Sequence, residues 1–373
     1  MSDLTLIILA AGGSTRFNSP IKKQWLRIGH EPLWLFVASR FEKAKIFSNI
    51  IITASKHDVT FMHSYTQNKI VEGGASRQAS LKNALKHVDT PYVLVTDVAR
   101  SCISDAMLAK ILEKKDEADC IVPALNVNDT VVYDKNTIDR DKVLRIQTPQ
   151  LSRTDTLRKA LDTDIEYTDE SSAIAASGGS RIFVEGEENA FKLTFAGDVK
   201  EMECLKGPAN AALIGNGFDV HAFDDKGEMF LCGVKIENSF GFKAHSDGDV
   251  AIHSLIDALL GAAGMGDIGT LFPDSDESYK GIDSKILLKE VVTSLYSFGY
   301  SIVNVDITII AETPRIGAYK EIMRKTLSSI LQIPVFRVNV KATTTEKLGF
   351  IGRKEGVGVQ STASLNYFNW TNK

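Results

Sequence analysis

The stretch "LTLIILAAGGSTRF" at residues 4–17 runs from a largely apolar segment into a loop of small residues. A short apolar run of this kind, followed by turn residues, predicts a buried strand over residues 4–10. The small residues let backbone amides approach a phosphate closely, and Arg16 could neutralise the charge of that phosphate. The loop contains neither GK[ST] nor GxGxxG, so taken alone it is equally typical of a tight strand-to-helix turn.

Outward from this stretch, strand and helix patterns alternate through the first half of the chain. Strands alternating with helices predict a parallel sheet that is covered on both faces. Ser104 is expected to cap the helix that follows it. The expected strands are 4–10, 49–55, 91–97 and 119–125, and the expected helices are 32–44, 75–88 and 104–118.

Residues 126–150 interrupt this rhythm. The segments "TVVYD" and "KVLRI" flank "KNTIDRD", which predicts a β-hairpin arm, and the alternation then resumes to about residue 195. Gly207-Pro208 marks a linker at 206–211 between a first domain, 1–205, and a second domain, 212–373. In the second domain the expected strands are 212–222, 301–311, 336–343 and 356–365, and the expected helices are 247–262, 283–298 and 315–331.

Composition excludes several classes of function. The 373 residues carry a net charge of −4 and show no basic run, so we expect no nucleic-acid partner. No apolar stretch is long enough to cross a membrane, and the first basic residue, Arg16, follows the early apolar run, unlike a signal peptide. The four cysteines form no CxxC pair, which is typical of free thiols in a reducing cytosol. We therefore expect a cytoplasmic protein.

Three further polar segments follow: one lies a short loop beyond the glycine-rich stretch, and two come directly after strands. They are "KKQ" at 22–24, "EGGASRQAS" at 72–80 and "TDVARS" at 96–101, the last of which carries Asp97 and Arg100. In open α/β sheets, ligands bind beyond the carboxyl ends of the strands, where these loops are expected to lie. Turn chemistry alone does not explain so many charged groups at one edge, so the sequence predicts a phosphate-bearing ligand there.

The second domain opens with "GFDVHAF" at 217–223, where Asp219 and His221 point to the same side of an expected strand. His253 lies in the apolar helical run "DVAIHSLIDALLGA", for which Asp247 is the expected N-cap. Taken alone, the strand residues could face solvent and His253 could be an ordinary core histidine. Together they form an Asp-His-His set, and three protein ligands with one open position are typical of a catalytic Zn²⁺ site.

The first domain resembles the 2-C-methyl-D-erythritol 4-phosphate cytidylyltransferases over about residues 3–200. "LAAGGSTRF", "KKQ", "EGGASRQAS", "VLVTDVARS", "TIDRDKVLRIQTPQ" and "NAFKLT" occur in the order typical of that family. The resemblance implies a Rossmann-like nucleotidyltransferase domain that transfers CMP from CTP to methylerythritol phosphate, with Mg²⁺ or Mn²⁺ at the nucleotide phosphates. Two positions depart from the family pattern: Ser14 replaces a frequent Gly, and Ala75 replaces a carboxylate that could contact the nucleotide.

This resemblance also implies roles for single residues. Arg16 and Lys23 would flank the reacting phosphates, and Asp97 would lie near the nucleotide and its metal ion. The arm residue Arg140 would reach into a neighbouring subunit, which implies a dimer of this domain. The expected nucleotide contacts are Ala10, Ala11, Gly12, Gly74 and Ser80, and the expected methylerythritol phosphate contacts are Arg100, Arg140, Thr148 and Lys192.

The second domain resembles the 2-C-methyl-D-erythritol 2,4-cyclodiphosphate synthases over about residues 212–366. "DVHAF", "AHSDGDVAIH", "GDIGTLFPD" and "KATTTEKLGF" carry this resemblance. It implies an α+β domain in which a 2-phosphate attacks the β-phosphorus of a CDP group and CMP leaves. Asp219, His221 and His253 would bind Zn²⁺, and Glu346 would bind a second ion, Mg²⁺ or Mn²⁺.

In this family the active sites lie between the subunits of a trimer, so several contacts would come from different chains. His245 and Ser246 would position the attacking phosphate. Thr344 would be a catalytic residue that lies in the cytidine pocket. Arg315 stands where the family often has Lys, which keeps the charge but changes the geometry. The other expected substrate contacts are Asp267, Gly269, Asp274, Ala311, Pro314, Ala342, Thr343, Phe350 and Arg353.

Both resemblances together predict a bifunctional enzyme of the non-mevalonate isoprenoid pathway. A kinase must act between its two reactions, so the fusion does not by itself imply channelling. Dimeric first domains and trimeric second domains could build a hexamer, which is a hypothesis. Two alternatives stay open at this point: a sugar-phosphate nucleotidyltransferase fused to a metal-dependent phosphate lyase, and a non-catalytic nucleotide-binding scaffold.

Overall fold

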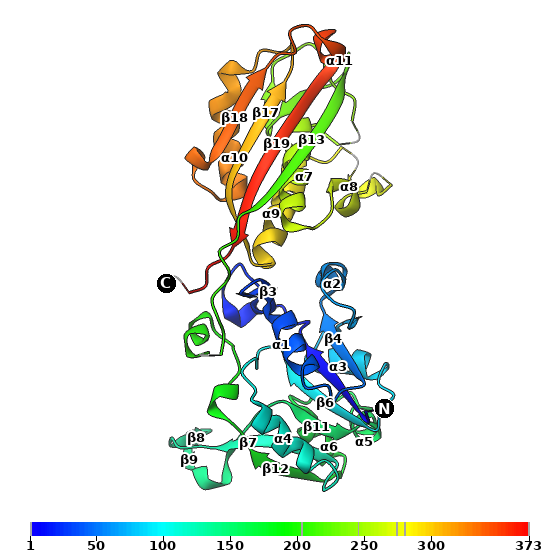
Figure 1. Cartoon of the computed structure of the whole chain (residues 1–373), viewed down its shortest axis with the longest axis vertical. Coiled ribbons are helices and arrows are strands. Elements are labelled where there is room, and N and C mark those ends of the chain that lie inside the picture. The colour runs from blue at the N-terminus through cyan, green and yellow to red at the C-terminus, as the bar shows by residue number, and fades with distance from the viewer. Residues whose placement is uncertain (1, 203, 245, 274, 280, 372–373) are drawn as a thin grey trace. The chain divides into compact units, whose positions relative to one another are not determined.

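The computed structural model describes residues 2–202, 204–244, 246–273, 275–279 and 281–371 (Figure 1). The chain forms two compact units, Met1–Pro208 with Trp370–Lys373, and Ala209–Asn369. The division falls inside the predicted linker, whose limits stay a prediction. Trp370 counts with the first unit, where its indole Nε1 donates a hydrogen bond to the Arg27 carbonyl oxygen at 2.8 Å.

The first unit is built around one large sheet with the strand order β10-β7-β11-β6-β1-β4-β5, and β12 pairs with β7. Strands β6, β1, β4 and β5 run parallel, whereas β11 runs antiparallel to both β6 and β7. All six residues of β1 are buried, as expected for a strand covered on both faces. The strands are β1 Leu4–Leu9, β4 Asn49–Ala54, β5 Lys69–Glu72, β6 Tyr92–Asp97, β7 Cys120–Asn126, β10 Leu144–Ile146, β11 Gln150–Arg153 and β12 Arg181–Glu185.

Helices connect these strands, and apolar side chains from both kinds of element share one core. The predicted cap is confirmed for α4, because the Ser104 hydroxyl accepts a hydrogen bond from the Met107 amide. One helix, α2, follows β4 although the sequence analysis did not anticipate it. The helices are α1 Leu33–Glu42, α2 Lys56–His63, α3 Arg77–Leu85, α4 Asp105–Glu113, α5 Thr154–Ala160 and α6 Glu170–Ala176.

The predicted arm is correct in kind but wrong in its pairing. The hairpin consists of β8 Val131–Tyr133 and β9 Asn136–Ile138, joined by Asp134 and Lys135, which both have positive φ. The segment "KVLRI" does not pair with "TVVYD" but forms β10 and joins the main sheet beside β7. Tight turns with left-handed residues join adjacent strand segments, which favours this shorter hairpin.

The second unit has a five-stranded sheet with the order β16-β13-β19-β17-β18. Strands β13, β19 and β17 are antiparallel neighbours, and β18 runs parallel to β17. The helices α7, α9 and α10 pack on one face of this sheet, behind the long strands as Figure 1 draws them. The strands are β13 Leu213–Asp224, β14 Met229–Leu231, β15 Val234–Ile236, β16 Gly241–Phe242, β17 Tyr300–Ile310, β18 Val338–Thr343 and β19 Gly356–Tyr367.

The helices of this unit are α7 Val250–Ala263, α8 Ile268–Leu271, α9 Ser284–Ser297, α10 Lys320–Leu331 and α11 Gly349–Gly352. The expected cap of α7 is wrong: Asp249 accepts the hydrogen bond from the Ile252 amide, whereas Asp247 accepts one from Ser284. Two acidic residues precede this helix, and only the one directly before it has the geometry of a cap.

Helix α7 lies unusually close to β13. A β-carbon on Gly217 would sit 1.9 Å from the Ser254 carbonyl oxygen, and one on Gly215 would sit 2.1 Å from that of Ala258. Only glycine permits this approach, because any side chain would collide with the helix backbone. The contact brings His253 on α7 over the strand that carries Asp219 and His221.

The free-thiol prediction is wrong for two of the four cysteines. Cys102 and Cys204 form a disulfide bond across 102 residues of sequence, whereas Cys120 and Cys232 are free and buried. Spacing alone could not reveal this pair, since the two segments meet only in the folded unit. None of the helices formed by the described residues combines the length and apolar character needed to cross a bilayer.

Candidate active sites

A cavity of about 350 Å³ lies at the carboxyl ends of β1, β4 and β6. It is lined by the loop after β1, the loop after β5 and the residues that follow β6. This is the edge at which the sequence predicted a phosphate-bearing ligand. The predicted site residues that line it are Ala10, Ala11, Gly12, Arg16, Lys23, Gly74, Ser80, Asp97 and Lys192.

Backbone and hydroxyl groups shape the glycine loops of this cavity. The Ser80 hydroxyl accepts a hydrogen bond from the Gly74 amide at 3.0 Å and donates one to the Ser76 carbonyl oxygen at 2.8 Å. A β-carbon on Gly74 would lie 2.5 Å from that of Ala79, so the loop requires glycine at this position. The loop is therefore fixed by the helix that it precedes, α3.

Ser14, a departure from the family pattern, has a structural role here. Its hydroxyl donates to Gln24 Oε1 at 2.9 Å and accepts from the Lys23 amide at 3.1 Å. Gln24 Nε2 in turn donates to the Gly12 carbonyl oxygen at 3.0 Å. These bonds tie the glycine-rich loop to the turn that carries Lys23.

Asp97 is the electrostatic centre of the cavity. Its side chain is 10% exposed and accepts from Arg77 Nε at 3.1 Å and from Lys192 Nζ at 2.6 Å. Burial by itself would raise the pKa of Asp97, but the charges of Arg77 and Lys192 offset this and hold the pKa below its ordinary value. The carboxylate is therefore ionised at neutral pH.

Lys23 lies in the same electrostatic field. Its ammonium donates to the Leu193 carbonyl oxygen at 3.1 Å. Burial lowers the pKa of Lys23, the charge of Lys192 adds to this effect, and Asp97 opposes it. The Lys23 ammonium lines the cavity beside Arg16, so both cations face the space in which a phosphate could lie.

Three predicted site residues do not line this cavity. Arg100 follows the strand that carries Asp97; its guanidinium donates to the Ala190 carbonyl oxygen at 2.6 Å, and burial lowers its pKa. Thr148 accepts a hydrogen bond from the Asp97 amide at 3.2 Å, so it supports the cavity wall. Arg140 lies on the exposed arm, with its side chain 54% exposed and bonded to the Asn128 carbonyl oxygen.

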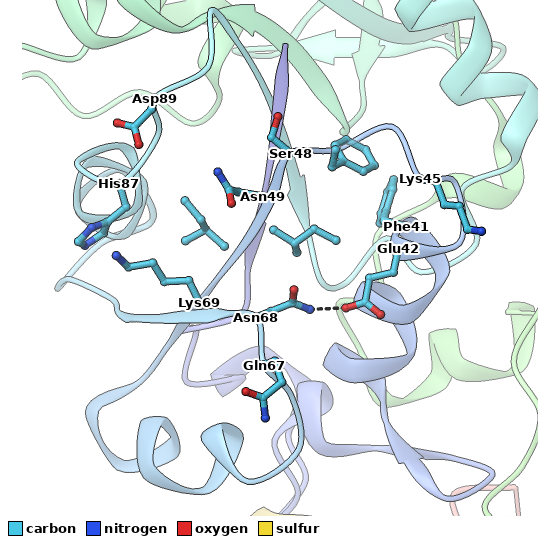
Figure 2. Close-up of a pocket in the computed structure, with 13 residues that line it drawn as sticks. Phe41, Glu42, Lys45, Ser48, Asn49, Gln67, Asn68, Lys69, His87 and Asp89 are labelled. Carbon is cyan, nitrogen blue, oxygen red and sulfur yellow. Dashed lines mark hydrogen bonds between the residues drawn. The ribbon is translucent and has the colours of Figure 1, made fainter. Parts of the chain in front are cut away.

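A larger cavity, of about 500 Å³, lies at the opposite end of the same sheet (Figure 2). It opens beside the first residues of β4 and β5, Asn49 and Lys69, and none of the predicted site residues lines it. Its charged groups have both signs, and Glu42 accepts a hydrogen bond from Asn68 there (Figure 2). Without a convergent set of charges, its lining identifies no ligand.

In the second unit, Asp219, His221 and His253 meet as predicted. Their ligand atoms all lie within 4.8 Å of one another. Asp219 Oδ2 is 3.1 Å from His221 Nε2 and 3.5 Å from His253 Nδ1, so the two imidazoles face one carboxylate oxygen. Burial by itself would raise the pKa of Asp219, but hydrogen bonds from both histidines hold it below its ordinary value.

The remaining ring nitrogens of both histidines have their own partners. His221 Nδ1 is 2.8 Å from the Gly248 carbonyl oxygen. His253 Nε2 is 3.0 Å from the Ser284 hydroxyl, which donates to Asp247 Oδ1 at 2.5 Å. Such partners fix the ring orientation of metal-binding histidines, so this donor set fits a divalent transition metal ion.

The triad forms one wall of a cavity of about 250 Å³. Ser246 and Gly269 line this cavity as predicted, and the Ser246 hydroxyl lies 3.1 Å from His253 Nε2. Asp267 instead caps α8 by accepting from the Thr270 amide at 2.8 Å. The predictions for His245 and Asp274 lie outside the described residues.

The remaining predicted residues of the second unit form a largely exposed group at or near the carboxyl ends of β17 and β18. The Ala311 amide donates to the Thr343 carbonyl oxygen at 3.0 Å, and Thr344 donates to Glu346 Oε1 at 3.0 Å. None of these residues lines the triad cavity. The group comprises Ala311, Pro314, Arg315, Ala342, Thr343, Thr344, Glu346, Phe350 and Arg353.

The sequence analysis missed several residues that organise these sites. Arg77 and Gln24 stand in motifs that were recognised, but neither was assigned a role. Glu170 and Glu312 stand in segments that were not examined. Glu312 Oε1 accepts from the amides of Thr345 and Lys347, both at 3.1 Å, and so shapes the loop that carries Glu346.

Comparison with known families divides the chain in the same way. Residues 4–205 match the family model described as 2-C-methyl-D-erythritol 4-phosphate cytidylyltransferase, and residues 212–366 match that of the YgbB family. The chain is 63% identical over 368 residues to the bifunctional enzyme IspD/IspF of Sulfurimonas denitrificans, with 99% of this chain and 95% of that protein covered.

A second relative, the bifunctional enzyme IspD/IspF of Campylobacter jejuni, is 49% identical over 372 residues, and both chains are covered completely. Among solved structures, that of the bifunctional IspDF from Campylobacter jejuni is similar to this chain with a TM-score of 0.92 and 48% identity. The match covers 100% of both chains, so the likeness extends over both units.

Proposed function

The chain belongs to the family of bifunctional IspD/IspF enzymes, and on that premise we propose that the two cavities described above are its two active sites. Its first activity transfers CMP from CTP to 2-C-methyl-D-erythritol 4-phosphate and releases pyrophosphate. Its second activity cyclises 4-diphosphocytidyl-2-C-methyl-D-erythritol 2-phosphate to the 2,4-cyclodiphosphate and releases CMP. Both belong to the non-mevalonate isoprenoid pathway, and the two alternatives, an unrelated fusion and a scaffold, are set aside.

In the first cavity, Arg16 and Lys23 would contact the phosphates at the reacting centre. Negative charge on the phosphate oxygens rises in the transition state of phosphoryl transfer, so fixed cations are the main catalytic need. The loops with Ala10, Ala11, Gly12, Gly74 and Ser80 would hold the nucleotide through backbone groups. Asp97 would lie near Mg²⁺ or Mn²⁺ at the phosphates.

The methylerythritol phosphate would enter beside Lys192, with Arg100 and Thr148 behind the cavity wall. Arg140 would complete this pocket from a neighbouring subunit. The observation that supports this is its place on an exposed arm, away from the cavity of its own chain. A dimer of first units is therefore part of the proposal.

In the second cavity, Asp219, His221 and His253 would hold Zn²⁺. One carboxylate oxygen and two oriented imidazole nitrogens suit this ion, and a fourth position would be left for a substrate oxygen. When bound, the ion would draw electron density from the β-phosphate of the substrate. His245 and Ser246 would position the attacking 2-phosphate, and Asp267, Gly269 and Asp274 would contact the sugar parts.

Glu346 would hold Mg²⁺ or Mn²⁺ at the diphosphate, and the exposed group around it would form the cytidine pocket. Because that group does not line the triad cavity of its own chain, a neighbouring subunit would supply it. The outer face of the sheet, with Ile214 65% and Phe218 60% exposed on β13, offers an apolar surface for such contacts. A trimer of second units, and a hexamer with the dimer, follow as hypotheses; a cytoplasmic location stays a prediction.

The Asp219-His221-His253 set carries this proposal, because its three ligand atoms lie within 4.8 Å of one another and suit a divalent transition metal ion. The first experiment measures CMP release from the diphosphocytidyl substrate by the intact chain, by His253→Ala and by Lys23→Ala. We expect only His253→Ala to lose this activity. Normal CMP release by His253→Ala would reject the triad, and its loss in Lys23→Ala would reject the assignment of separate sites.

A further inference from the structure

Four charged side chains of alternating sign connect helix α6 to the first cavity. Glu170, the first residue of α6, accepts from Arg77 Nη1 at 2.7 Å and from Nη2 at 3.4 Å. Arg77 Nε donates to Asp97 Oδ1 at 3.1 Å, and Lys192 Nζ donates to Asp97 Oδ2 at 2.6 Å. The row begins at a fully buried carboxylate and ends at an ammonium on the cavity wall.

Arg77 cannot turn without breaking bonds to two carboxylates. Its planar fork binds Glu170 through two nitrogens and Asp97 through the third. Asp97 Oδ1 is therefore occupied, and Oδ2 is directed to Lys192. Although burial opposes it, the charges of Glu170 and Asp97 raise the pKa of Arg77 above its ordinary value, so Arg77 stays charged.

Stability alone does not account for this arrangement. Burying an ion pair costs desolvation free energy, and well-packed apolar residues often serve equally well in its place. The Glu170 side chain is 0% exposed, whereas Lys192 at the other end is 35% exposed and free to reach a ligand. The buried Glu170–Arg77 pair therefore holds Asp97 and Lys192, which face the cavity, in fixed positions.

We propose that Glu170 and Arg77 are positioning residues of the cytidylyl transfer, which fix Asp97 so that its second oxygen, Oδ2, holds Lys192 ready for methylerythritol phosphate. This rests on the proposed function, since it takes Lys192 as a contact to that substrate. Glu170 itself contacts neither substrate. When the phosphate arrives, Lys192 can move from Asp97 Oδ2 to a phosphate oxygen while Arg77 keeps Asp97 in place.

The test uses the full chain with Glu170→Gln, which keeps the side-chain shape and removes one charge. We expect the KM for methylerythritol phosphate to rise by about tenfold, because that is the effect of losing one charge-assisted hydrogen bond. The KM for CTP should change less. Glu185→Gln is the matched control, because it breaks an exposed ion pair with Lys110 in the same unit, away from the cavity. CMP release by the second site reports the concentration of intact chain.

A double-variant comparison separates positioning from a general loss of structure. In a Lys192→Ala background, Glu170→Gln is expected to cause no further rise in the KM for methylerythritol phosphate, because its effect passes through Lys192. An equal rise in both backgrounds overturns the proposal, and so does a lower unfolding temperature with an unchanged KM.

Arg77→Lys provides a second route if Glu170→Gln does not fold. It keeps the charge but cannot bridge two carboxylates, so a raised KM that again depends on Lys192 supports the proposal, and a wild-type KM overturns it. The proposed function is tested separately: if Lys192→Ala leaves the wild-type KM unchanged, the role of Lys192 fails before Glu170 is considered.

Discussion

The two candidate sites differ in how much of each a single chain assembles. In the first unit, nine of the predicted residues from five separate segments line one cavity, whereas Arg140 lies on an exposed arm and does not line it. In the second unit, Asp219, His221 and His253 come together as one candidate metal site, but the predicted cytidine pocket lies outside its cavity. On the proposed function, the second site would therefore need more residues from a neighbouring subunit than the first site does.

The physical reason for this difference lies in the strand order of each sheet. Parallel strands β1, β4 and β6 bring their carboxyl ends, and the loops that follow, to one edge. In the mixed sheet of the second unit, β13 runs antiparallel to β19, and the triad lies on the helix-covered face of β13. The exposed loop after β18 therefore does not line the triad cavity.

Loss of a residue of the candidate metal triad is expected to cause the largest difference in activity between the two sites. His253→Ala should lower the rate of CMP release by about a thousandfold, because a Lewis acid contributes several kcal/mol to such a transition state. Chelation of divalent ions should do the same to the wild-type chain, and re-addition of Zn²⁺ should restore activity only in the wild type. Pyrophosphate release from CTP by His253→Ala serves as the control and should stay normal.

Loss of Lys23 should affect the other site by a slightly smaller factor. Lys23→Ala is expected to lower pyrophosphate release by about a hundredfold to a thousandfold, as found when one fixed donor to a developing charge is removed. Cyclodiphosphate formation should be unchanged in the same preparation. A parallel loss of both activities would mean that the units do not work independently.

Loss of the disulfide should lower the stability of the first unit and leave that of the second unit unchanged. Cys102→Ser removes a cross-link across 102 residues and is expected to lower the free energy of unfolding of the first unit by about 2–4 kcal/mol. Thermal unfolding followed by calorimetry should show one shifted transition and one unchanged transition. Cys232→Ser is not a suitable control because Cys232 is fully buried; Cys204→Ser should reproduce the shift, and no shift in either variant contradicts the cross-link.

The arm tests whether the first site is shared between subunits. Arg140→Ala is expected to lower cytidylyl transfer by about tenfold to a hundredfold, the contribution of one guanidinium–phosphate contact. Mixing this variant with Lys23→Ala should restore part of the activity, since some sites would then receive both intact residues. If the mixture is no more active than its components, Arg140 acts within its own chain.

The smallest expected effect is a shift in pH dependence. Because the folded-state pKa of Lys23 is lowered, its ammonium loses the proton at a lower pH than the ordinary value of about 10.4. The kcat/KM for CTP should therefore fall on the alkaline side below that pH, and Lys23→Arg should move this limb to higher pH. An unchanged alkaline limb in Lys23→Arg would assign it to another group.

The metal triad shows what sequence patterns could determine. Asp219 and His221 share one face of a strand because side chains alternate, and His253 was added because it completes an Asp-His-His set and stands in a motif of the resembling family. The glycine loops could be recognised equally well, because their small residues and flanking strands are local features. Such features depend on neighbours in sequence, so the sequence by itself predicted both candidate sites and the α/β class of the first domain, whereas the α+β class of the second was implied by its family resemblance.

Other features depend on contacts between distant segments. Arg77 meets Glu170 across 93 residues, and Cys102 meets Cys204 across 102. The hairpin pairing and the choice of Asp249 over Asp247 as a cap also depended on backbone geometry that no local pattern specifies. Only the tertiary structure decided these, because buried charges and thiols find their partners through the packing of the whole unit.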